Sequence, residues 1–360
     1  MKKAVVCTGL TLQLFAFTLA AQQTGVQANP GPIDGVGQFS FPAPTPAPAA
    51  AKRAEDWNVL SVDPATLQPL SYAVIGTTET ADFTRELLRV QWRVADPIDL
   101  YVVKPHGVEK PPVVLYLYSY PSDTDRFRDD GWCRRATQDG FAAVGFVSAL
   151  TGQRYAYRPM REWFVSELQE SLGASTHDVQ MILNYLARRG DLSVQQVGML
   201  GQGSGGAIAV LAAEADPRIA VLDLLNPWGD WPDWFRTSPQ VPDQERAAYL
   251  QPEFLKRVAN LDPVLYLPHL HLKALRVEQV MDEPITPNDA KQKIGAAVQP
   301  PDQLVRYADE KEHMVSWRVT GLSGWIHSQL RPASAATNGQ DAPAQAPAAR
   351  STPPPDSEMK

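Results

Sequence analysis

Apolar runs typical of buried β-strands alternate with helical patterns along most of this chain of 360 residues. Between Ser175 or Thr176, as the N-cap, and Gly190, as the C-terminal stop, apolar residues recur at helical spacing and predict a helix. Strands separated by helices favour an α/β fold with a mostly parallel central sheet and helices on both faces. In such sheets, binding and catalysis gather at the C-terminal ends of the strands. The predicted strands cover residues 99–103, 113–118, 141–148, 197–201, 219–225 and 275–280.

The beginning of the sequence is typical of an export signal. A short positive start at Lys2 and Lys3 precedes an uncharged, mostly apolar run, and small residues place the cleavage site after Ala21 or Ala28. Residues 1–28 are therefore predicted to be a signal peptide. We expect an exported bacterial protein, periplasmic or extracellular, with no stable membrane span after signal cleavage.

Two stretches rich in Pro and Ala flank the middle of the chain. Residues 29–54 are predicted to be a linker and residues 332–360 a disordered tail, because neither can bury enough apolar surface to fold. A single domain is therefore expected over residues 55–331. Cys7 leaves with the signal peptide, so Cys133 remains alone and no internal disulfide can form.

Charge and histidine spacing exclude several classes of function. The formal net charge is −7, which lacks the basic excess that binding to a nucleic-acid backbone needs. His269 and His271 are two residues apart, but no cysteine or further acidic cluster completes a set of metal ligands. We therefore expect no nucleic acid, no metal and no cofactor. The sequence does not indicate an oligomeric state.

A glycine-rich turn follows the predicted strand over residues 197–201. Gly201, Gly203 and Gly206 match the pattern G-x-G-x-x-G of dinucleotide-binding turns. In dinucleotide-binding folds this turn normally belongs to the first strand–helix–strand unit, whereas several strands precede it here. A dinucleotide-dependent oxidoreductase that uses these glycines remains one alternative.

The same stretch, VGMLGQGSGGA, resembles the α/β-hydrolase superfamily, particularly its dienelactone-hydrolase-like and prolyl-oligopeptidase-like branches. Those proteins carry a pattern like V-G-L-L-G-H-S-M-G-G-A, whose serine is the nucleophile on a tight strand-to-helix elbow. Alignment without a gap puts Gly203 at the nucleophile position and Ser204 one residue beyond it. The resemblance implies an α/β-hydrolase domain related to serine esterases and peptidases. Because glycine has no side chain to activate, covalent catalysis is expected to be impaired or lost.

The resemblance also implies positions for the acid and the histidine of a catalytic triad. Glu283, with Asp282 as the neighbouring alternative, lies in the turn after the penultimate strand of the family pattern, and His313 precedes the final helix. The carboxylate would orient the imidazole, which would act as general base. An active carboxylic-ester hydrolase with Ser204 as nucleophile is a second alternative. Alternatively, Glu283, Asp282 and His313 are ordinary surface residues without a catalytic role.

Two loops are expected to complete the site. The backbone of Ser204, together with Tyr118 and Ser119 from the loop after the strand over residues 113–118, would supply the oxyanion donors. Ser204 alternatively begins the following helix and caps it with its hydroxyl. The expected ligand is a small ester- or peptide-like molecule. The candidates for an apolar pocket wall, or alternatively for a loop packed on the core, are Trp228, Trp231 and Trp234.

Overall fold

A computed structural model describes residues 55–94, 96–122, 124–150, 154, 167–321 and 323–331. The predicted signal peptide, linker and tail therefore lie outside the described residues. The helices and strands belong to the unit that begins at Glu55.

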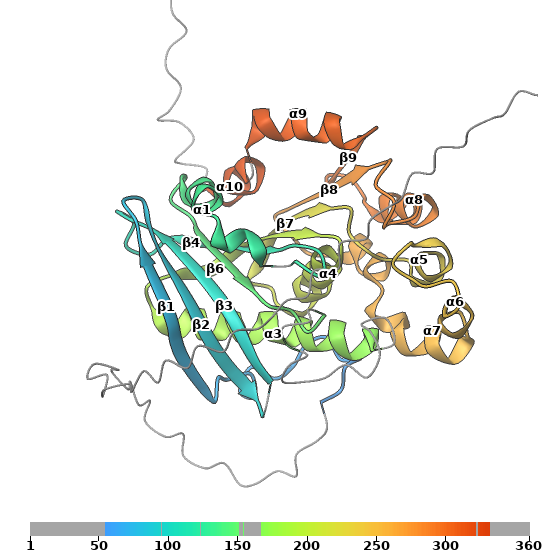
Figure 1. The fold of residues 1–360 in the computed structure, drawn as a ribbon, viewed down its shortest axis with the longest axis horizontal. Coiled ribbons are helices and arrows are strands. Elements are labelled where there is room, and N and C mark those ends of the chain that lie inside the picture. Colours follow the sequence, from blue (N-terminus) through green and yellow to red (C-terminus); the bar gives the residue numbers. More distant parts are fainter. Residues whose placement is uncertain are drawn as a thin grey trace, which may run out of the picture. The chain divides into compact units, whose positions relative to one another are not determined.

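The described residues build one nine-stranded sheet, in the order β1-β2-β3-β5-β4-β6-β7-β8-β9 (Figure 1). The first three pairs in that order are antiparallel, and every pair from β5 to β9 is parallel. The prediction of a mostly parallel α/β sheet is thus confirmed. The strands are β1 (Ser71–Glu79), β2 (Phe83–Arg93), β3 (Asp96–Pro105), β4 (Pro112–Leu117), β5 (Ala142–Phe146), β6 (Ser193–Gln202), β7 (Ile219–Leu225), β8 (Ala274–Val280) and β9 (Gln303–Tyr307).

Helices cover both faces of the sheet, and the central strand β4 shows why. Val113 and Leu115 point to one core, which includes residues of helices α3 and α4, while Val114 and Tyr116 point to a second core beneath α1 and α10. Strands buried on both faces read as continuous apolar runs, which is why β4 and β7 could be predicted. The helices are α1 (Asp130–Thr137), α3 (Leu168–Arg189), α4 (Ser204–Ala215), α5 (Trp231–Thr237), α6 (Arg246–Tyr249), α7 (Pro252–Val258), α8 (Asn288–Ala297), α9 (Glu310–Thr320) and α10 (Gly324–Leu330).

The predicted start of α3 is wrong, although its end is right. The helix begins at Leu168, and Ser175 and Thr176 lie buried inside it. Their hydroxyls donate to carbonyls one turn earlier, so these polar groups are satisfied without ending the helix. Gly190 ends α3 with a φ of 75°, a left-handed conformation that glycine adopts without steric penalty.

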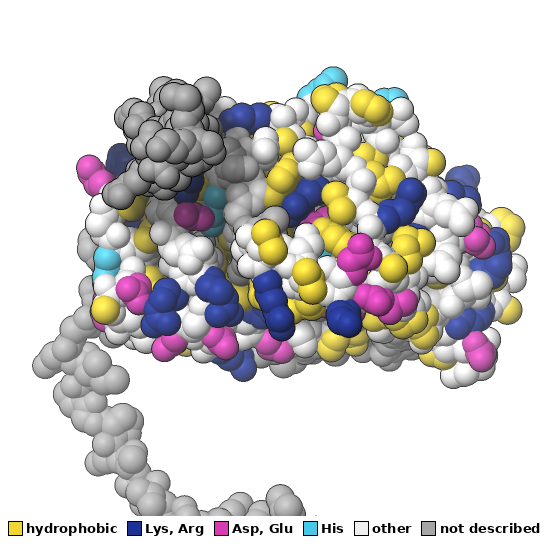
Figure 2. All heavy atoms as spheres, turned by 90° about the horizontal axis from the view of Figure 1, so that it is seen from above, with side chains coloured by type: hydrophobic (Ala, Val, Ile, Leu, Met, Phe, Trp, Pro, Cys, Tyr) yellow, Lys and Arg dark blue, Asp and Glu magenta, His cyan; other side chains and the backbone are white. Residues whose placement is uncertain are grey.

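One face of the molecule exposes charged side chains of both signs together with apolar ones (Figure 2). On the face drawn in Figure 2, Lys and Arg side chains are interspersed with Asp and Glu. In the part of the chain that the structure describes, no helix is both long enough and apolar enough to cross a membrane.

Candidate functional site

The glycine-rich turn forms a sharp elbow between β6 and α4. Gly203 has a φ of 56° and a ψ of −117°, a backbone conformation that is strained for residues with a side chain. Its N–H donates to the carbonyl of Leu225, and its own carbonyl accepts from the N–H of Trp228, both at 3.0 Å. The elbow is therefore held by the loop that follows β7. Gly205 allows a close approach on the other side, since a Cβ there would lie 1.9 Å from the carbonyl oxygen of Leu117.

The space in front of Gly203 is already filled. A Cβ on Gly203 would lie 2.4 Å from the Ser119 Oγ, 2.8 Å from the Ser119 Cβ and 3.1 Å from the Trp228 Nε1. Real Cβ atoms do not approach other atoms this closely, so a side chain at this position requires Ser119 to move. The Ser119 Oγ is itself buried and has no hydrogen-bond partner among the described residues. Ser119 thus acts as a packing residue at the elbow.

Ser204 is the first residue of α4 and points away from solvent. Its side chain is buried, and its Oγ accepts a hydrogen bond of 2.8 Å from the backbone N–H of Tyr120. Ser204 begins α4, as one interpretation of the sequence predicts. Its hydroxyl does not cap the helix, however, but binds the loop after β4. This contact also occupies one of the loop N–H groups that could have faced an oxyanion.

Glu283 organises the turn after β8. Its Oε1 accepts from the N–H of Ile285 at 2.7 Å and its Oε2 from the N–H of Thr286 at 3.1 Å. The buried ammonium group of Lys291 lies 3.7 Å from the same carboxylate. Asp282 is exposed on the turn. Both carboxylates are thus accounted for by turn formation and solvation.

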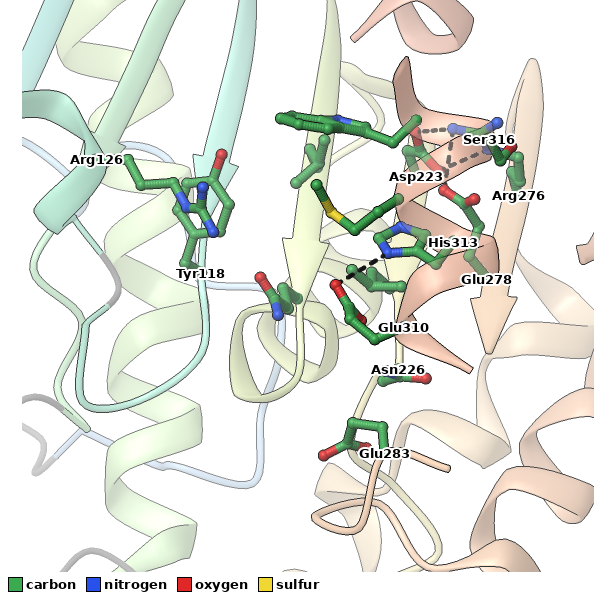
Figure 3. Close-up of a pocket in the computed structure, with 15 residues that line it drawn as sticks. Tyr118, Arg126, Asp223, Asn226, Arg276, Glu278, Glu283, Glu310, His313 and Ser316 are labelled. Atoms are coloured by element: carbon green, nitrogen blue, oxygen red, sulfur yellow. Dashed lines mark hydrogen bonds and ion pairs between the residues drawn. The ribbon is translucent and has the colours of Figure 1, made fainter. Parts of the chain in front are cut away.

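His313 lies in the first turn of α9, which a capping box starts. The Asp309 carboxylate accepts from the N–H of Glu312, whose own carboxylate accepts from the N–H of Ala308. The His313 Nδ1 lies 3.5 Å from the Glu310 Oε1. Figure 3 marks this contact with a dashed line. Within the described part of the chain, no hydrogen bond or ion pair joins His313 to Glu283 or Asp282. The sequence signal that would have found Glu310 is its spacing of three residues from His313 on one helix.

A pocket of about 250 Å³ lies where His313 faces the sheet (Figure 3). Tyr118 contributes from directly after β4 and Gln202 from the end of β6, whereas Met314 and Trp317 contribute from α9. The Tyr118 hydroxyl accepts from the Trp132 indole N–H at 2.9 Å, and burial raises its pKa to about 12. Further lining residues are Arg126, Asn226, Glu283 and Glu310.

The floor of the pocket is a buried polar network across β7, β8 and β9. The Arg276 guanidinium binds both oxygens of Asp223, with Nε–Oδ1 and Nη2–Oδ2 distances of 2.9 and 2.6 Å. It also lies 3.0 Å from the Glu278 Oε1, and the Tyr307 hydroxyl donates to the Glu278 Oε2 at 2.6 Å. Burial, together with the nearby Glu278 carboxylate, raises the pKa of Asp223 to about 6 in spite of Arg276. Charged residues inside otherwise apolar strands are the sequence signal of this network.

The three tryptophans after β7 pack into the core. Trp228, Trp231 and Trp234 are almost fully buried, and the Trp228 and Trp234 rings lie 4.8 Å apart. The Trp231 indole N–H donates to the carbonyl of Leu261. Among the described residues that line the pocket there is no tryptophan of this loop. They pack as a loop on the core, with Trp228 against Gly203, and Trp231 also lines a second, separate pocket together with Leu255 and Leu265.

The elbow offers little room for a dinucleotide. The helix turn formed by Ser204, Gly205 and Gly206 is buried, and a Cβ on Gly206 would lie 2.8 Å from the Cβ of Pro227. A pyrophosphate requires such a turn to be open. The described residues also contain no group of three His, Cys, Asp or Glu side chains placed to hold a metal ion.

Comparisons with known proteins agree with this architecture. No protein-family model matches the chain, and no curated protein matches it by sequence. An acetyl xylan esterase from Paenibacillus sp. R4 is similar in structure, with a TM-score of 0.55, 14% identity, and coverage of 74% of this chain and 94% of that one.

Two further solved structures give the same result. Acetyl xylan esterase 1 from Thermoanaerobacterium sp. JW/SL YS485 matches with a TM-score of 0.54 and 12% identity, over 76% of this chain and 92% of that one. A cold-adapted esterase from an Arctic intertidal metagenomic library matches with a TM-score of 0.50 and 12% identity, over 73% of this chain and all (100%) of that one. The sheet order, the elbow between β6 and α4 and these similarities together show that the chain has the α/β-hydrolase fold.

Proposed function

We propose that this protein is an exported relative of serine esterases and peptidases that binds a small ester- or peptide-like ligand without forming a covalent intermediate. The observation that carries the proposal is Gly203, which has the strained backbone of an elbow but no side chain to attack a substrate. The ligand site is the pocket between α9 and the ends of β6, β7 and β8. This edge of a parallel sheet is where ligands of α/β proteins usually bind.

The surroundings of Gly203 support a lasting loss of covalent chemistry. Ser119 fills the space that a nucleophile would need, and the Ser204 hydroxyl is buried against the backbone of Tyr120. His313 pairs with Glu310 and with neither acid of the turn after β8. A hydrolase triad needs nucleophile, base and acid in one chain of hydrogen bonds, and these residues do not form one.

Labelling with a fluorophosphonate probe tests the loss of covalent catalysis. The full chain is expected to remain unlabelled and to hydrolyse p-nitrophenyl acetate no faster than buffer containing imidazole. Specific labelling that disappears in Ser204→Ala would overturn the proposal in favour of an active hydrolase. Ser323→Ala is the matched control, because Ser323 is also buried and hydrogen-bonded, to Tyr116, but lies outside the pocket.

Calorimetric titration tests the ligand site itself. Methyl 3-phenylpropionate is expected to bind the wild-type protein and to bind Trp317→Ala at least about tenfold more weakly, since an aromatic wall would be lost. Val319→Ala serves as control, because Val319 is on the same helix but 84% exposed. Equal weakening by both variants, or no binding at all, would contradict the assignment of the pocket.

We infer export from the sequence of residues 1–28 and the linker character of residues 29–54. Expression of the full chain in a bacterial host, followed by fractionation and N-terminal sequencing, tests this inference. The mature protein is expected outside the cytoplasm, beginning at Gln22 or Asn29. An intact Met1 in the cytoplasmic fraction would refute export.

A further inference from the structure

The polar network under α9 is short of one positive charge. Two buried carboxylates, Asp223 and Glu278, surround the single guanidinium of Arg276. The other partner of Glu278 is the neutral hydroxyl of Tyr307, and no further cation pairs with these two acids in the described part of the chain. Two ionised carboxylates with one cation leave an uncompensated negative charge in a region of low dielectric constant, which is costly.

This imbalance raises the affinity of the network for a proton. Burial and the neighbouring Glu278 carboxylate raise the pKa of Asp223 to about 6, although Arg276 binds both of its oxygens. Each carboxylate oxygen can accept more than one hydrogen bond, so acceptor capacity remains after the Arg276 and Tyr307 contacts. A cationic group of a ligand could therefore replace the proton and restore charge balance.

This network opens into the pocket. Asp223 and Glu278 keep 3% and 9% of their surface exposed, and both line the cavity of about 250 Å³. His313 is also buried and lines the cavity, and its buried Nδ1 makes no hydrogen bond to a described residue, since the Glu310 Oε1 lies 3.5 Å away. A buried imidazole nitrogen without a hydrogen bond indicates that a ligand group or solvent completes it. Met314 and Trp317 add an apolar wall next to these polar groups.

We propose that the pocket selects ligands that carry a free amine beside an apolar body, with the ammonium group bound between Asp223 and Glu278 and the apolar body against Met314 and Trp317. This inference rests on the proposed function, since it takes the same pocket as the ligand site and narrows the class of ester- or peptide-like ligands. Arg126 lies at the rim, where its guanidinium stacks on Tyr118 at 4.7 Å and is exposed to solvent. Water weakens its field relative to that of the buried carboxylates.

Three probes of similar size test the inference: 2-phenylethylamine, 2-phenylethanol and 3-phenylpropionate. Calorimetric titration of the full chain at pH 7.5 is expected to show the amine binding at least about tenfold more tightly than the alcohol, because charge-assisted hydrogen bonds are the stronger ones. The carboxylate is expected to bind no better than the alcohol. Equal affinity for amine and alcohol would overturn the inference, and tightest binding of the carboxylate would overturn it in favour of Arg126.

Substitutions of the two carboxylates test where the ammonium group of the ligand binds. Asp223→Asn keeps the size of the side chain and leaves Arg276 balanced by Glu278, so the preference for the amine over the alcohol is expected to disappear. Asp289→Asn is the matched control, because it also removes one carboxylate charge but Asp289 is exposed on α8 and does not line the pocket, and it is expected to change the preference less than about threefold. A preference that survives in Asp223→Asn would overturn the inference. Should Asp223→Asn not fold, as judged by circular dichroism, Glu278→Gln is expected to give the same loss.

The result separates this inference from the proposed function. If methyl 3-phenylpropionate binds but the amine has no advantage over the alcohol, the selectivity is wrong and the ligand site stands. Fluorophosphonate labelling that depends on Ser204 would refute the noncovalent function without bearing on the amine preference. Failure of all four compounds to bind would refute both.

Discussion

Replacing Gly203 by serine tests the packing of the elbow directly. The new Cβ would lie 2.4 Å from the Ser119 Oγ and 2.8 Å from the Ser119 Cβ, at a φ of 56°. Overpacking costs about 1–3 kcal/mol and a residue with a side chain at positive φ about 1–2 kcal/mol, so Gly203→Ser is expected to destabilise the fold by about 2–5 kcal/mol. Ser119→Gly removes both clashing atoms and should return about 1–3 kcal/mol to the double variant.

Urea denaturation of the four proteins of this cycle measures the coupling between the two positions. Gly107→Ser is the matched control, since Gly107 has a φ of 77° but nothing lies within 4 Å of a Cβ there. Its cost should be that of the backbone alone, about 1–2 kcal/mol. The reasoning fails if Gly203→Ser costs no more than Gly107→Ser, or if Ser119→Gly brings no relief. For the same steric reason, Gly203→Ser alone is not expected to restore ester hydrolysis.

Three further predictions concern ionisation and burial. Arg189 lowers the pKa of Asp191 to about 2 from the usual 3.8, so the Asp191 carboxylate stabilises the fold above pH 4 and loses that stabilisation as pH falls towards 2. In urea denaturation, Asp191→Asn should lower the free energy of unfolding by about 1 kcal/mol at pH 7 after solvent screening, and should have no effect at pH 2. The pKa of Asp223 is raised to about 6, so between pH 4 and 6 the folded protein holds a proton that the unfolded chain has released. The free energy of unfolding should therefore fall as pH rises from 4 to 7, and this decrease should be smaller in Asp223→Asn. Ser204→Ala removes the hydroxyl that accepts from the partly buried N–H of Tyr120 and should lower the free energy of unfolding by about 1 kcal/mol, whereas a neutral effect would show that water replaces the hydroxyl.

Most of the parallel half of the sheet was predictable because burial on both faces leaves a strong local signal, whereas β9, an edge strand that is mostly not buried, was missed. The run over residues 219–225 predicts β7 with its observed ends, since nearly every position in it is apolar. β1 and β2 escaped prediction, because most residues of β1 are exposed and the strand lies at an edge of the sheet. Its pairing with β2 is a tertiary property that periodicity does not report.

In the candidate site too, features with a local sequence signal were predictable and features that depend on tertiary contacts were not. The spacing of glycines around Gly203 predicts a tight turn, and the structure has that turn between β6 and α4. The role of Ser119 depends on two loops that are far apart in sequence, so no local pattern reveals it. The partner of His313 was sought in the turn after β8, because a family pattern guided the search; the structure places Glu310, one helical turn away, beside it.

The contact between Ser119 and Gly203 also constrains the order in which substitutions could place a side chain at the elbow. A single substitution at Gly203 meets the occupied space first and would be removed by its cost in stability before any activity could be selected. The reverse order is open, because loss of the unpartnered Ser119 hydroxyl leaves no broken hydrogen bond behind. A side chain at the elbow therefore becomes compatible with the fold only after a change in a different loop, the one that carries Ser119.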